Sequence, residues 1–344
     1  MGNRVLLAFS GGIDSSAAVG ILRREGFDVE VMTIDMMGDE ALVAKAASAA
    51  ERLGVKFHLV DGRELFSREI VDDFVGEYLS GRTPAPCTRC NTLIKWRLLV
   101  ECADRLGIHF IATGHYFRVE EHRGLAYVRR GCDPKKDQSY YLWGVPQEAL
   151  SRAVTPMGEL IKAEVKLGSD EQRESMGVCF LGGRPYSEFL CSRCGELAVG
   201  EVVSTSGEVV GRHNGVARYT IGQRRGEGIP SGLRVVGLDG ERNVVRVGEN
   251  RLLFHTRLIV DGCYFADVEE VMSSSEVSVM IRGIGLNPEG YASVKVIESS
   301  TSDGVTAEIT LSNPAWAAAA GQPVVLYIGG RVVGGGYLKS SFEV

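Results

Sequence analysis

Short apolar runs alternate with segments of helical periodicity in the first third of the chain. Four runs predict strands: residues 4–9, 28–34, 55–60 and 109–112. Residues 15–25 and 41–53 carry Ala, Val, Ile and Leu at helical spacing, and Gly54 ends the second segment. Strands that alternate with helices predict an α/β fold with a doubly wound parallel sheet.

The pattern changes after about residue 195. Short Val-rich runs of alternating polarity predict antiparallel strands at 201–203, 208–210, 234–238 and 243–247. Ser206-Gly207 and Asp239-Gly240 lie between them as hairpin turns. A further β-rich part ends in the runs 323–328 and 331–336, typical of a small barrel. The sequence therefore predicts an α/β domain over 1–194, a central β-rich domain over 195–260 and a C-terminal β-barrel over 261–344.

Composition narrows the class of protein. The 344 residues contain 44% hydrophobic and 24% charged residues, as expected for a globular enzyme. No apolar run is long enough to span a bilayer, and no cleavage site follows the first apolar stretch, so we expect a cytoplasmic protein without membrane contact. The net charge of -6 argues against general coating of nucleic acid, although a local basic face would suffice for RNA. The eight cysteines are then expected to be reduced.

A glycine- and serine-rich loop, Ser-Gly-Gly-Ile-Asp-Ser-Ser over 10–16, joins the first predicted strand to the first helix. Glycines allow close approach of the backbone, and amides at a helix start bind anions. Asp14 can hold Mg²⁺ against pyrophosphate. The alternative is a plain turn with a serine helix cap. No Gly-Lys-Ser/Thr follows, and the loop resembles that of enzymes that cleave ATP to AMP and pyrophosphate, without choosing among them.

Later motifs resemble one family, the tRNA-specific 2-thiouridylases. They are Gly-Arg-Thr-Pro-Ala-Pro-Cys-Thr-Arg-Cys-Asn (81–91), Ile-Lys-Trp (94–96), Ala-Thr-Gly-His-Tyr (112–116), Lys-Asp-Gln-Ser-Tyr (136–140), Gly-Val-Cys-Phe (177–180) and Tyr-Thr-Ile-Gly-Gln-Arg-Arg-Gly (219–226). The resemblance runs from the first strand to the glycines at 334–336. It implies an ATP-dependent enzyme that replaces the C2 oxygen of the wobble uridine of tRNA with sulfur.

The resemblance implies roles for two cysteines. Cys179 would carry a persulfide received from a sulfur-donor protein, and Cys90 would be the partner nucleophile. Uridine would first be adenylated at its C2 oxygen, so that AMP and pyrophosphate are released. Taken alone, Cys179 in its apolar run reads as a buried core cysteine, and Cys90 as half of a metal-binding Cys-x-x-Cys pair.

The remaining site residues also follow from the resemblance. ATP would be contacted by Ala8, Phe9, Ser10, Gly11, Gly12, Ile13, Asp14, Ser15, Ile34 and Gly114. The tRNA would be contacted by Ala85, Pro86, Cys87, His115, Lys136, Asp137, Gln138 and Gln322. Without the family, His115 would read as a capping or core histidine, and 136–138 as a solvated charged turn.

The chain departs from the family at a few positions. Ala85 stands where the family usually has Asn, and Arg282-Gly283 where it commonly has Arg-Tyr. Cys191 and Cys194 form a second Cys-x-x-Cys pair that the family does not explain. These thiols are either inert or join Cys87 and Cys90 in a four-thiolate site for Zn or an iron–sulfur cluster.

Two basic clusters favour RNA contact over scattered surface charge. One comprises Arg118, Arg123, Arg129, Arg130, Lys135 and Lys136, and the other Arg212, His213, Arg218, Arg224 and Arg225. Two competing hypotheses remain. An ATP pyrophosphatase-type ligase acting on a small molecule would need neither Cys90 nor Cys179, and a non-catalytic RNA-binding or sulfur-carrier relative would not need an intact nucleotide loop.

Overall fold

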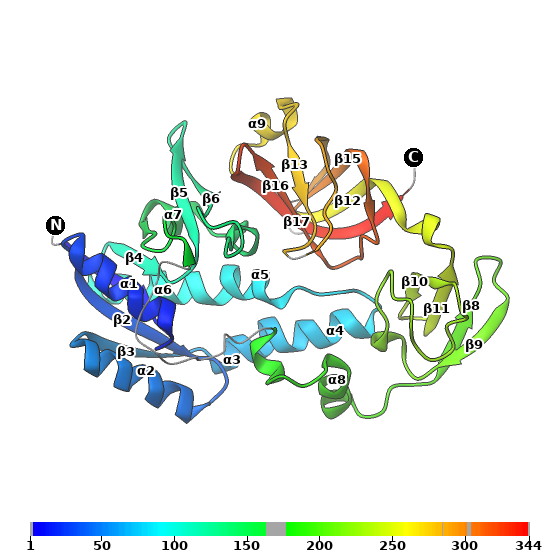
Figure 1. Cartoon of the computed structure of the whole chain (residues 1–344), viewed down its shortest axis with the longest axis horizontal. Coiled ribbons are helices and arrows are strands. Elements are labelled where there is room, and N and C mark those ends of the chain that lie inside the picture. Colours follow the sequence, from blue (N-terminus) through cyan, green and yellow to red (C-terminus); the bar gives the residue numbers. More distant parts are fainter. Residues whose placement is uncertain (1–2, 163–176, 284, 301–303, 343–344) are drawn as a thin grey trace. The chain divides into compact units, whose positions relative to one another are not determined.

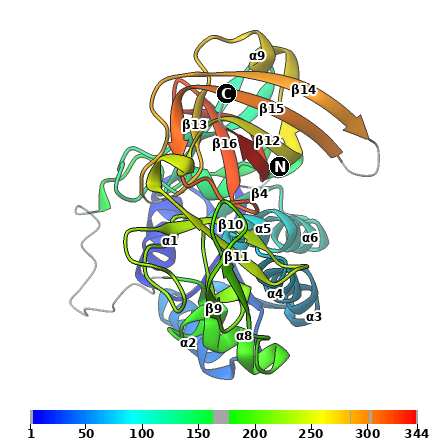
Figure 2. The same cartoon turned by 90° about the vertical axis from the view of Figure 1, so that its right-hand side faces the viewer.

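The computed structural model describes residues 3–162, 177–283, 285–300 and 304–342. The chain divides into two compact units. The first comprises residues 1–70, 87–174 and 329–333, and the second comprises 71–86, 175–328 and 334–344. Figures 1 and 2 show the elements in sequence colours.

The first unit is built on a parallel sheet in the order β3-β2-β1-β4-β7, which confirms the predicted α/β class. Its strands are β1 (Arg4–Ala8), β2 (Asp28–Asp35), β3 (Lys56–Asp61), β4 (Phe110–Thr113) and β7 (Ala153–Val154). Its longer helices are α1 (Ile13–Arg24), α2 (Glu40–Leu53) and α6 (Trp96–Leu106). A hairpin of β5 (Phe117–His122) and β6 (Leu125–Arg130) and the short helix α7 (Gln147–Ser151) follow β4.

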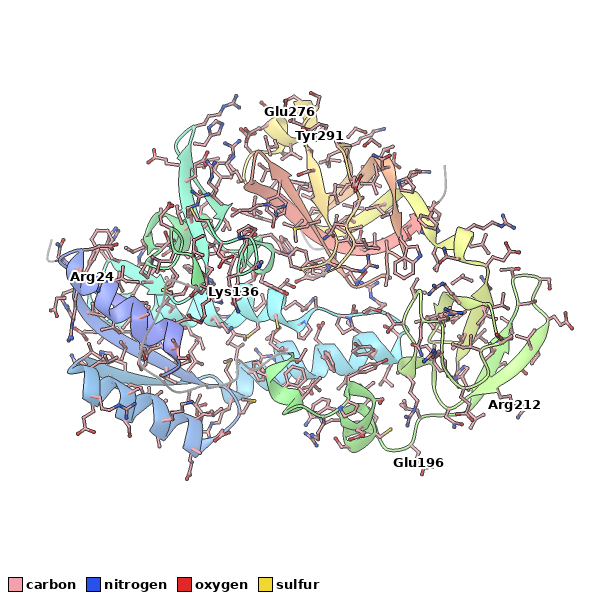
Figure 3. The ribbon with its side chains drawn as sticks, viewed as in Figure 1. Arg24, Lys136, Glu196, Arg212, Glu276 and Tyr291 are labelled. Carbon is pink, nitrogen blue, oxygen red and sulfur yellow. The ribbon has the colours of Figure 1, made fainter. Side chains whose placement is uncertain are left out.

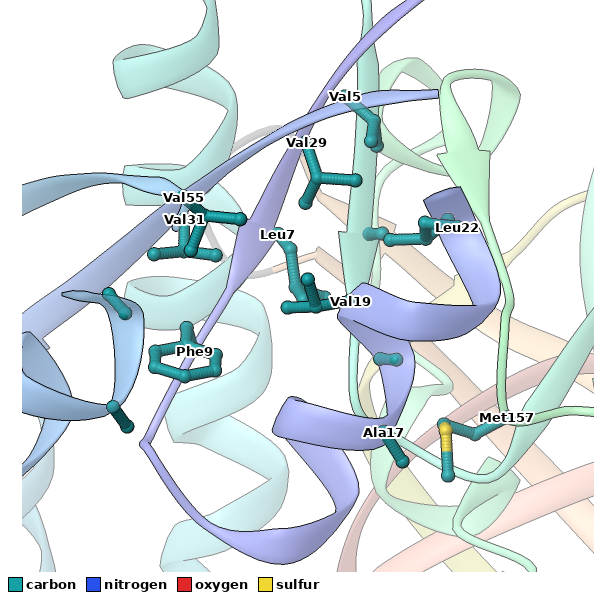
Figure 4. Packing of buried hydrophobic residues seen from close by; sticks show 14 of the residues in the cluster. Val5, Leu7, Phe9, Ala17, Val19, Leu22, Val29, Val31, Val55 and Met157 are labelled. Carbon is teal, nitrogen blue, oxygen red and sulfur yellow. The ribbon is translucent and has the colours of Figure 1, made fainter. Parts of the chain in front are cut away.

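The core of this sheet explains the apolar runs. Val5 and Leu7 of β1 are fully buried against Val19 and Leu22 of α1 and the valines of β2, as Figure 4 shows. A strand covered on both faces reads as a continuous apolar run, which is the pattern of a parallel sheet. Helix α2 begins at a cap in which Asp39 accepts hydrogen bonds from the amides of Ala41 and Leu42.

The second unit contains the β-rich half of the chain. Its first sheet has the order β10-β11-β8-β9, from β8 (Gly200–Val203), β9 (Val209–His213), β10 (Arg234–Asp239) and β11 (Val244–Gly248). Both predicted hairpins are confirmed, but β8 pairs with β11 in parallel, where the sequence predicts antiparallel strands throughout. The long connection between β9 and β10 places β10 on the outer side of β11. As a result, β11 runs parallel to its other neighbour, β8, instead of antiparallel to it.

The C-terminal strands close into a barrel, as predicted. Their order is β13-β16-β17-β12-β15-β14, and a bridge between Val277 and Ala292 joins the two ends of this order. The strands are β12 (Phe254–Phe265), β13 (Ser278–Met280), β14 (Ala292–Ser300), β15 (Gly304–Trp316), β16 (Pro323–Ile328) and β17 (Arg331–Phe342). Among the described residues, this bridge gives each of the two end strands a neighbour on its outer side.

Three short helices of the second unit pack through aromatic rings. They are α4 (Asp73–Leu79), the 3-10 turn η5 (Cys179–Leu181) and α8 (Tyr186–Cys194). Phe180 lies edge-on to Phe74 at 5.1 Å between ring centroids and contacts Phe189 at 5.3 Å. Tyr78 stacks on Tyr186 at 4.5 Å. These rings fix η5 and α8 on α4.

Candidate functional site

The loop between β1 and α1 is shaped by one backbone conformation. Gly11 has φ +68°, and a Cβ at this position would lie 2.9 Å from the backbone Cα of Ala46 in α2. A side chain is therefore excluded both by the torsion and by contact with backbone. Gly12 precedes α1 and has no side chain to cap the helix, so the first amides of α1 are available to an anionic ligand.

Serine hydroxyls hold the loop closed over this helix start. The hydroxyl of Ser15 donates to the carbonyl of Gly12 at 3.1 Å and accepts from the amide of Ser10 at 3.3 Å. The amide of Gly12 lies 3.4 Å from the Ser10 hydroxyl. These local bonds preorganise a loop that would otherwise have to be ordered by its ligand.

The Asp14 carboxylate has two partners from distant parts of the chain. Tyr116 donates its hydroxyl to Asp14 Oδ1 at 2.8 Å, and the Lys162 ammonium forms an ion pair with the same oxygen. Lys162 also lies 5.7 Å from the centroid of the Tyr116 ring. Sequence reasoning missed Lys162 because a lone lysine carries no signal. Its ammonium can neutralise phosphate charge at this helix start.

Three adjacent strands end beside the loop. β1 lies between β2 and β4 in the sheet, so Ala8, Ile34 and Gly114 all lie at the carboxyl ends of neighbouring parallel strands. A Cβ on Gly114 would be 3.3 Å from the amide of Ser15. The chain leaves β1 toward β2 on one side and reaches β4 on the other, which makes this edge the switch point where open α/β sheets bind ligands. The predicted ATP residues are thus brought together.

His115 lies directly after Gly114. Its Nδ1 is 3.0 Å from the Thr113 hydroxyl, and burial, aided by the charge of Lys95, lowers its pKa to about 3. The imidazole is therefore neutral at physiological pH and can offer a hydrogen bond but no charge to a substrate.

Cys90 lies at the same sheet edge as the nucleotide loop. It ends the short helix α5 (Pro86–Cys90), is buried, and places its thiol 3.9 Å from the sulfur of Met36, the residue that follows β2. The next residue, Asn91, is buried and donates its amide to the carbonyl of Tyr141 at 3.1 Å. This bond, within a wide helical turn over Asn91–Lys95, anchors the thiol segment.

Cys179 belongs to the second unit and is exposed. The interpretation of this residue as a buried core cysteine is therefore wrong: Phe180 is partly buried against the rings of Phe74 and Phe189, whereas the Cys179 side chain is exposed. An accessible thiol in a segment fixed by its neighbour suits exchange with another protein.

The predicted tRNA loop is held by its own side chains. The amide of Tyr116 donates to Gln138 Oε1 at 2.9 Å, and Asp137 accepts from the amide of Gly131 at 2.9 Å and the hydroxyl of Ser139 at 2.8 Å. Two of the three residues thus shape the loop, and Lys136, labelled in Figure 3, is the one that carries a cation. In the second unit, Gln322 Oε1 accepts from the amide of Ala319 at 3.0 Å, so this side chain also supports a turn.

The basic clusters are smaller than predicted. His213 is fully buried, its Nδ1 accepts from the amide of Gly215, and burial lowers its pKa, so it is not part of a cationic face. In the first cluster, Arg129 pairs with Glu120. The exposed arginines Arg212, Arg224 and Arg225 stay available; Arg212 is labelled in Figure 3.

Metal-binding residues do not gather in the part of the chain that the structure describes: no three His, Cys, Asp or Glu side chains are grouped there. The four-thiolate site predicted from Cys87, Cys90, Cys191 and Cys194 has no support. Mg²⁺ needs only one or two carboxylates together with substrate phosphates, so Asp14 alone fits a nucleotide-bound ion. The described helices also include none long and apolar enough to cross a membrane.

An anion-binding loop at the switch point of a parallel sheet defines an α/β enzyme of the adenine-nucleotide-binding class. Three family models match the chain in succession: a tRNA methyl transferase HUP domain over 3–183, a tRNA methyl transferase PRC-barrel domain over 187–249 and an aminomethyltransferase beta-barrel domain over 275–338. The chain is 37% identical to tRNA-specific 2-thiouridylase MnmA 3 of Bacteroides fragilis, over 98% of this chain and 94% of the relative. It is also 37% identical to tRNA-specific 2-thiouridylase MnmA of Thermus thermophilus, over 98% and 95%.

The chain belongs to the tRNA-specific 2-thiouridylase family. A solved NH3-dependent NAD synthetase from Campylobacter jejuni is similar at a TM-score of 0.31 and 17% identity, over 48% of this chain and 62% of that one. Family membership confirms the resemblance on which the predicted sites depend.

Proposed function

We propose that this enzyme uses ATP to replace the C2 oxygen of the tRNA wobble uridine with sulfur. The main support is that Cys90 and the nucleotide loop both lie at the carboxyl edge of the parallel sheet. The Cys90 thiol lies 3.9 Å from the sulfur of Met36, which follows β2, and Ile34 lies near the carboxyl end of the same strand. A small-molecule ligase would have no use for a thiol there.

The first step makes the C2 oxygen a leaving group. That oxygen attacks the α-phosphorus of ATP, a C–O–P linkage forms, and pyrophosphate leaves. The amides at the start of α1 and the Lys162 ammonium stabilise the phosphate charge that develops. Asp14 would hold Mg²⁺ on the pyrophosphate, and this requires its carboxylate to exchange Lys162 for the ion.

The second step transfers sulfur. The outer sulfur of a Cys179 persulfide, received from a sulfur-donor protein, attacks C2 and expels AMP. The Cys90 thiolate then attacks the inner sulfur, the S–S bond breaks, and 2-thiouridine forms together with a Cys90–Cys179 disulfide. The exposure of Cys179 supports loading by a donor protein, and burial of Cys90 supports protection of the second thiol until substrate is bound.

We assign recognition of tRNA to the residues that the family resemblance implies. His115 offers a neutral hydrogen-bonding group, Lys136 a cation, and residues 85–87 the segment beside the target base. Ala85 cannot offer the amide that the family usually places there. The exposed arginines of the second unit would meet phosphates.

Labelled sulfur separates the roles of the two cysteines. Cys179→Ser should accept no sulfane sulfur from a donor protein, because serine forms no persulfide, yet should still bind ATP and tRNA. Cys90→Ser should accept the label and fail to deliver it, as read by mass spectrometry of tRNA nucleosides. If Cys90→Ser fails to accept the label and Cys179→Ser accepts it, the roles of the two cysteines are reversed. If both variants thiolate tRNA at the wild-type rate, the proposed sulfur transfer is wrong.

A further inference from the structure

Cys191 and Cys194 occupy one face of α8. They are three residues apart in the last turns of the helix, where such positions place their Cβ atoms about 5–6 Å from each other. A disulfide needs Cα atoms roughly 4.4–6.8 Å apart and Cβ atoms about 3.5–4.5 Å apart, so its formation requires the last turn of α8 to bring the two Cβ atoms closer by about 1–2 Å. Cys191 is half-buried and Cys194 exposed, and neither is in a disulfide.

A guanidinium is placed on the first of these thiols. Arg218, in the turn η6 (Val216–Arg218), donates from Nη2 to the Sγ of Cys191 at 3.2 Å. The sulfur of Cys191 thus has a charged hydrogen-bond donor beside it, and cationic neighbours are typical of reactive cysteines. The neighbouring arginine of α8 is directed elsewhere, since Arg193 pairs with Asp72 at 2.8 Å.

The same helix is packed against the segment of Cys179. Phe180 and Phe189 are in ring contact at 5.3 Å, and both meet Phe74. Cys179, Cys191 and Cys194 therefore belong to one packed set of short elements in the second unit, and Cys179 is exposed.

We propose that Cys191 and Cys194 form a resolving dithiol that reduces the disulfide left on the enzyme after each sulfur transfer. This inference rests on the proposed function, which leaves Cys179 oxidised. The Cys191 thiolate attacks the Cys179 sulfur, the Cys90–Cys179 bond breaks, and the Cys90 thiolate leaves. Cys194 then loses its proton to solvent and attacks Cys191, and the Cys179 thiolate leaves. The two electrons of the dithiol pass to Cys90 and Cys179, which become thiols, and the oxidised Cys191–Cys194 disulfide is reduced by an external dithiol of the thioredoxin class.

Thiol reactivity tests the dithiol without tRNA. The reduced full-length chain is exposed briefly to a small aromatic disulfide at pH 7, and each cysteine is quantified by peptide mass spectrometry. Cys132 is the internal reference, because its hydrogen bond to Glu159 raises its pKa while its exposure is also intermediate. We expect Cys191 to react about tenfold faster than Cys132.

Arginine variants identify the cause of that reactivity. Arg218→Met should remove most of the tenfold advantage, whereas Arg212→Met, which deletes an exposed arginine of β9, should keep it. Equal rates at Cys191 and Cys132 in the wild-type chain, or thiols protected by a stoichiometric zinc ion, would overturn the proposal.

Trapping tests the exchange itself. After one round of sulfur transfer without reductant, the wild-type chain should carry the Cys191–Cys194 disulfide, and Cys194→Ser should accumulate a Cys179–Cys191 mixed disulfide. With a thioredoxin-class reductant, Cys191→Ser should lose about tenfold in multiple turnover relative to its single turnover, and Cys132→Ser should not. A persistent Cys90–Cys179 disulfide in wild type would overturn the proposal. A wild-type chain that makes no 2-thiouridine would instead defeat the proposed function, and the reactivity ratio would still decide whether a dithiol exists.

Discussion

Asp14 and Lys162 form an ion pair although 148 residues separate them in the sequence. Asp14 belongs to the nucleotide loop, and Lys162 is the last residue of the described range 3–162. The Tyr116 hydroxyl donates a hydrogen bond to the same oxygen of Asp14. We expect the entering nucleotide to break this pair, because phosphate competes for the ammonium and Mg²⁺ for the carboxylate.

Loss of the loop carboxylate should stop the reaction. Asp14→Ala is expected to lower thiolation by about 100-fold or more while the fold survives, because the side chain is part-exposed and, in the proposed mechanism, would organise Mg²⁺. Circular dichroism and AMP release measure the two effects. Asp28→Asn, at the exposed start of β2, is the control, and normal turnover by Asp14→Ala would remove Mg²⁺ organisation from the mechanism.

Loss of the partner ammonium should weaken nucleotide use in particular. Lys162→Met is expected to reduce kcat/KM for ATP by about 10- to 100-fold, and Lys162→Arg to recover part of it, since both lysine and arginine neutralise phosphate. Initial rates at varied ATP and fixed tRNA measure this. An effect confined to the KM for tRNA would contradict the assignment.

The loop glycine should tolerate no side chain. Gly11→Ala is expected to destabilise the fold by about 1–2 kcal/mol and to abolish ATP binding, because φ is +68° and the new Cβ meets backbone of α2. Adding Ala46→Gly should give no rescue, since the obstructing atom is the Cα at 2.9 Å. Urea unfolding and nucleotide titration report both effects, and rescue by the double variant would show that only a side chain obstructs.

Removal of both thiols of α8 should leave part of the activity. Cys191→Ser/Cys194→Ser is expected to thiolate tRNA when dithiothreitol replaces the resolving pair, because these thiols lie outside the motifs shared with the family. Nucleoside mass spectrometry with and without the reductant measures it. Stoichiometric metal in anaerobically purified wild type, lost together with activity in the double variant, would point to metal-dependent sulfur transfer instead.

Glu30 should contribute stability that acid removes. Burial alone would raise its pKa, but hydrogen bonds from Arg4 and His58 outweigh burial and lower the pKa from 4.5 to about 2. A depressed folded-state pKa stabilises the native state above pH 4.5, and this contribution, on the order of 2–3 kcal/mol, is lost as pH falls toward 2. Unfolding of Glu30→Gln across pH 2–7 should lack that slope. Glu101→Gln, which breaks an exposed pair with Arg97, should leave the free energy of unfolding nearly unchanged.

The pattern of apolar residues predicted helices and strands well where an element is buried on both faces or on every second residue. Residues 41–53 were expected to form a helix, and α2 covers Glu40–Leu53; residues 323–328 were expected to form a strand and do. The parallel pairing of β8 with β11 was missed because apolar periodicity specifies a strand but not its direction.

The site could be predicted from sequence only where function resides in a contiguous motif. The loop at 10–16 is a contiguous motif whose residue types indicate phosphate binding. Lys162 is far from this loop in the sequence, and only the structure shows that it lies beside Asp14. His213 shows the opposite failure: it resembled surface charge beside Arg212, but alternation along β9 turns it inward. The domain boundaries and the roles of the individual site residues stay predictions.

One short segment, synthesised late, is needed to complete the first unit. Residues 329–333 belong to the first unit, where Arg331 pairs with Glu120 and stacks on Tyr127 at 4.9 Å. The β5–β6 hairpin of the first unit therefore lacks a buried arginine partner until residues 329–333 have been synthesised. Nascent chains should stay partly open until the C-terminal strand emerges, so a premature stop near residue 320 would cost the N-terminal unit its last contacts as well as the barrel its final strand.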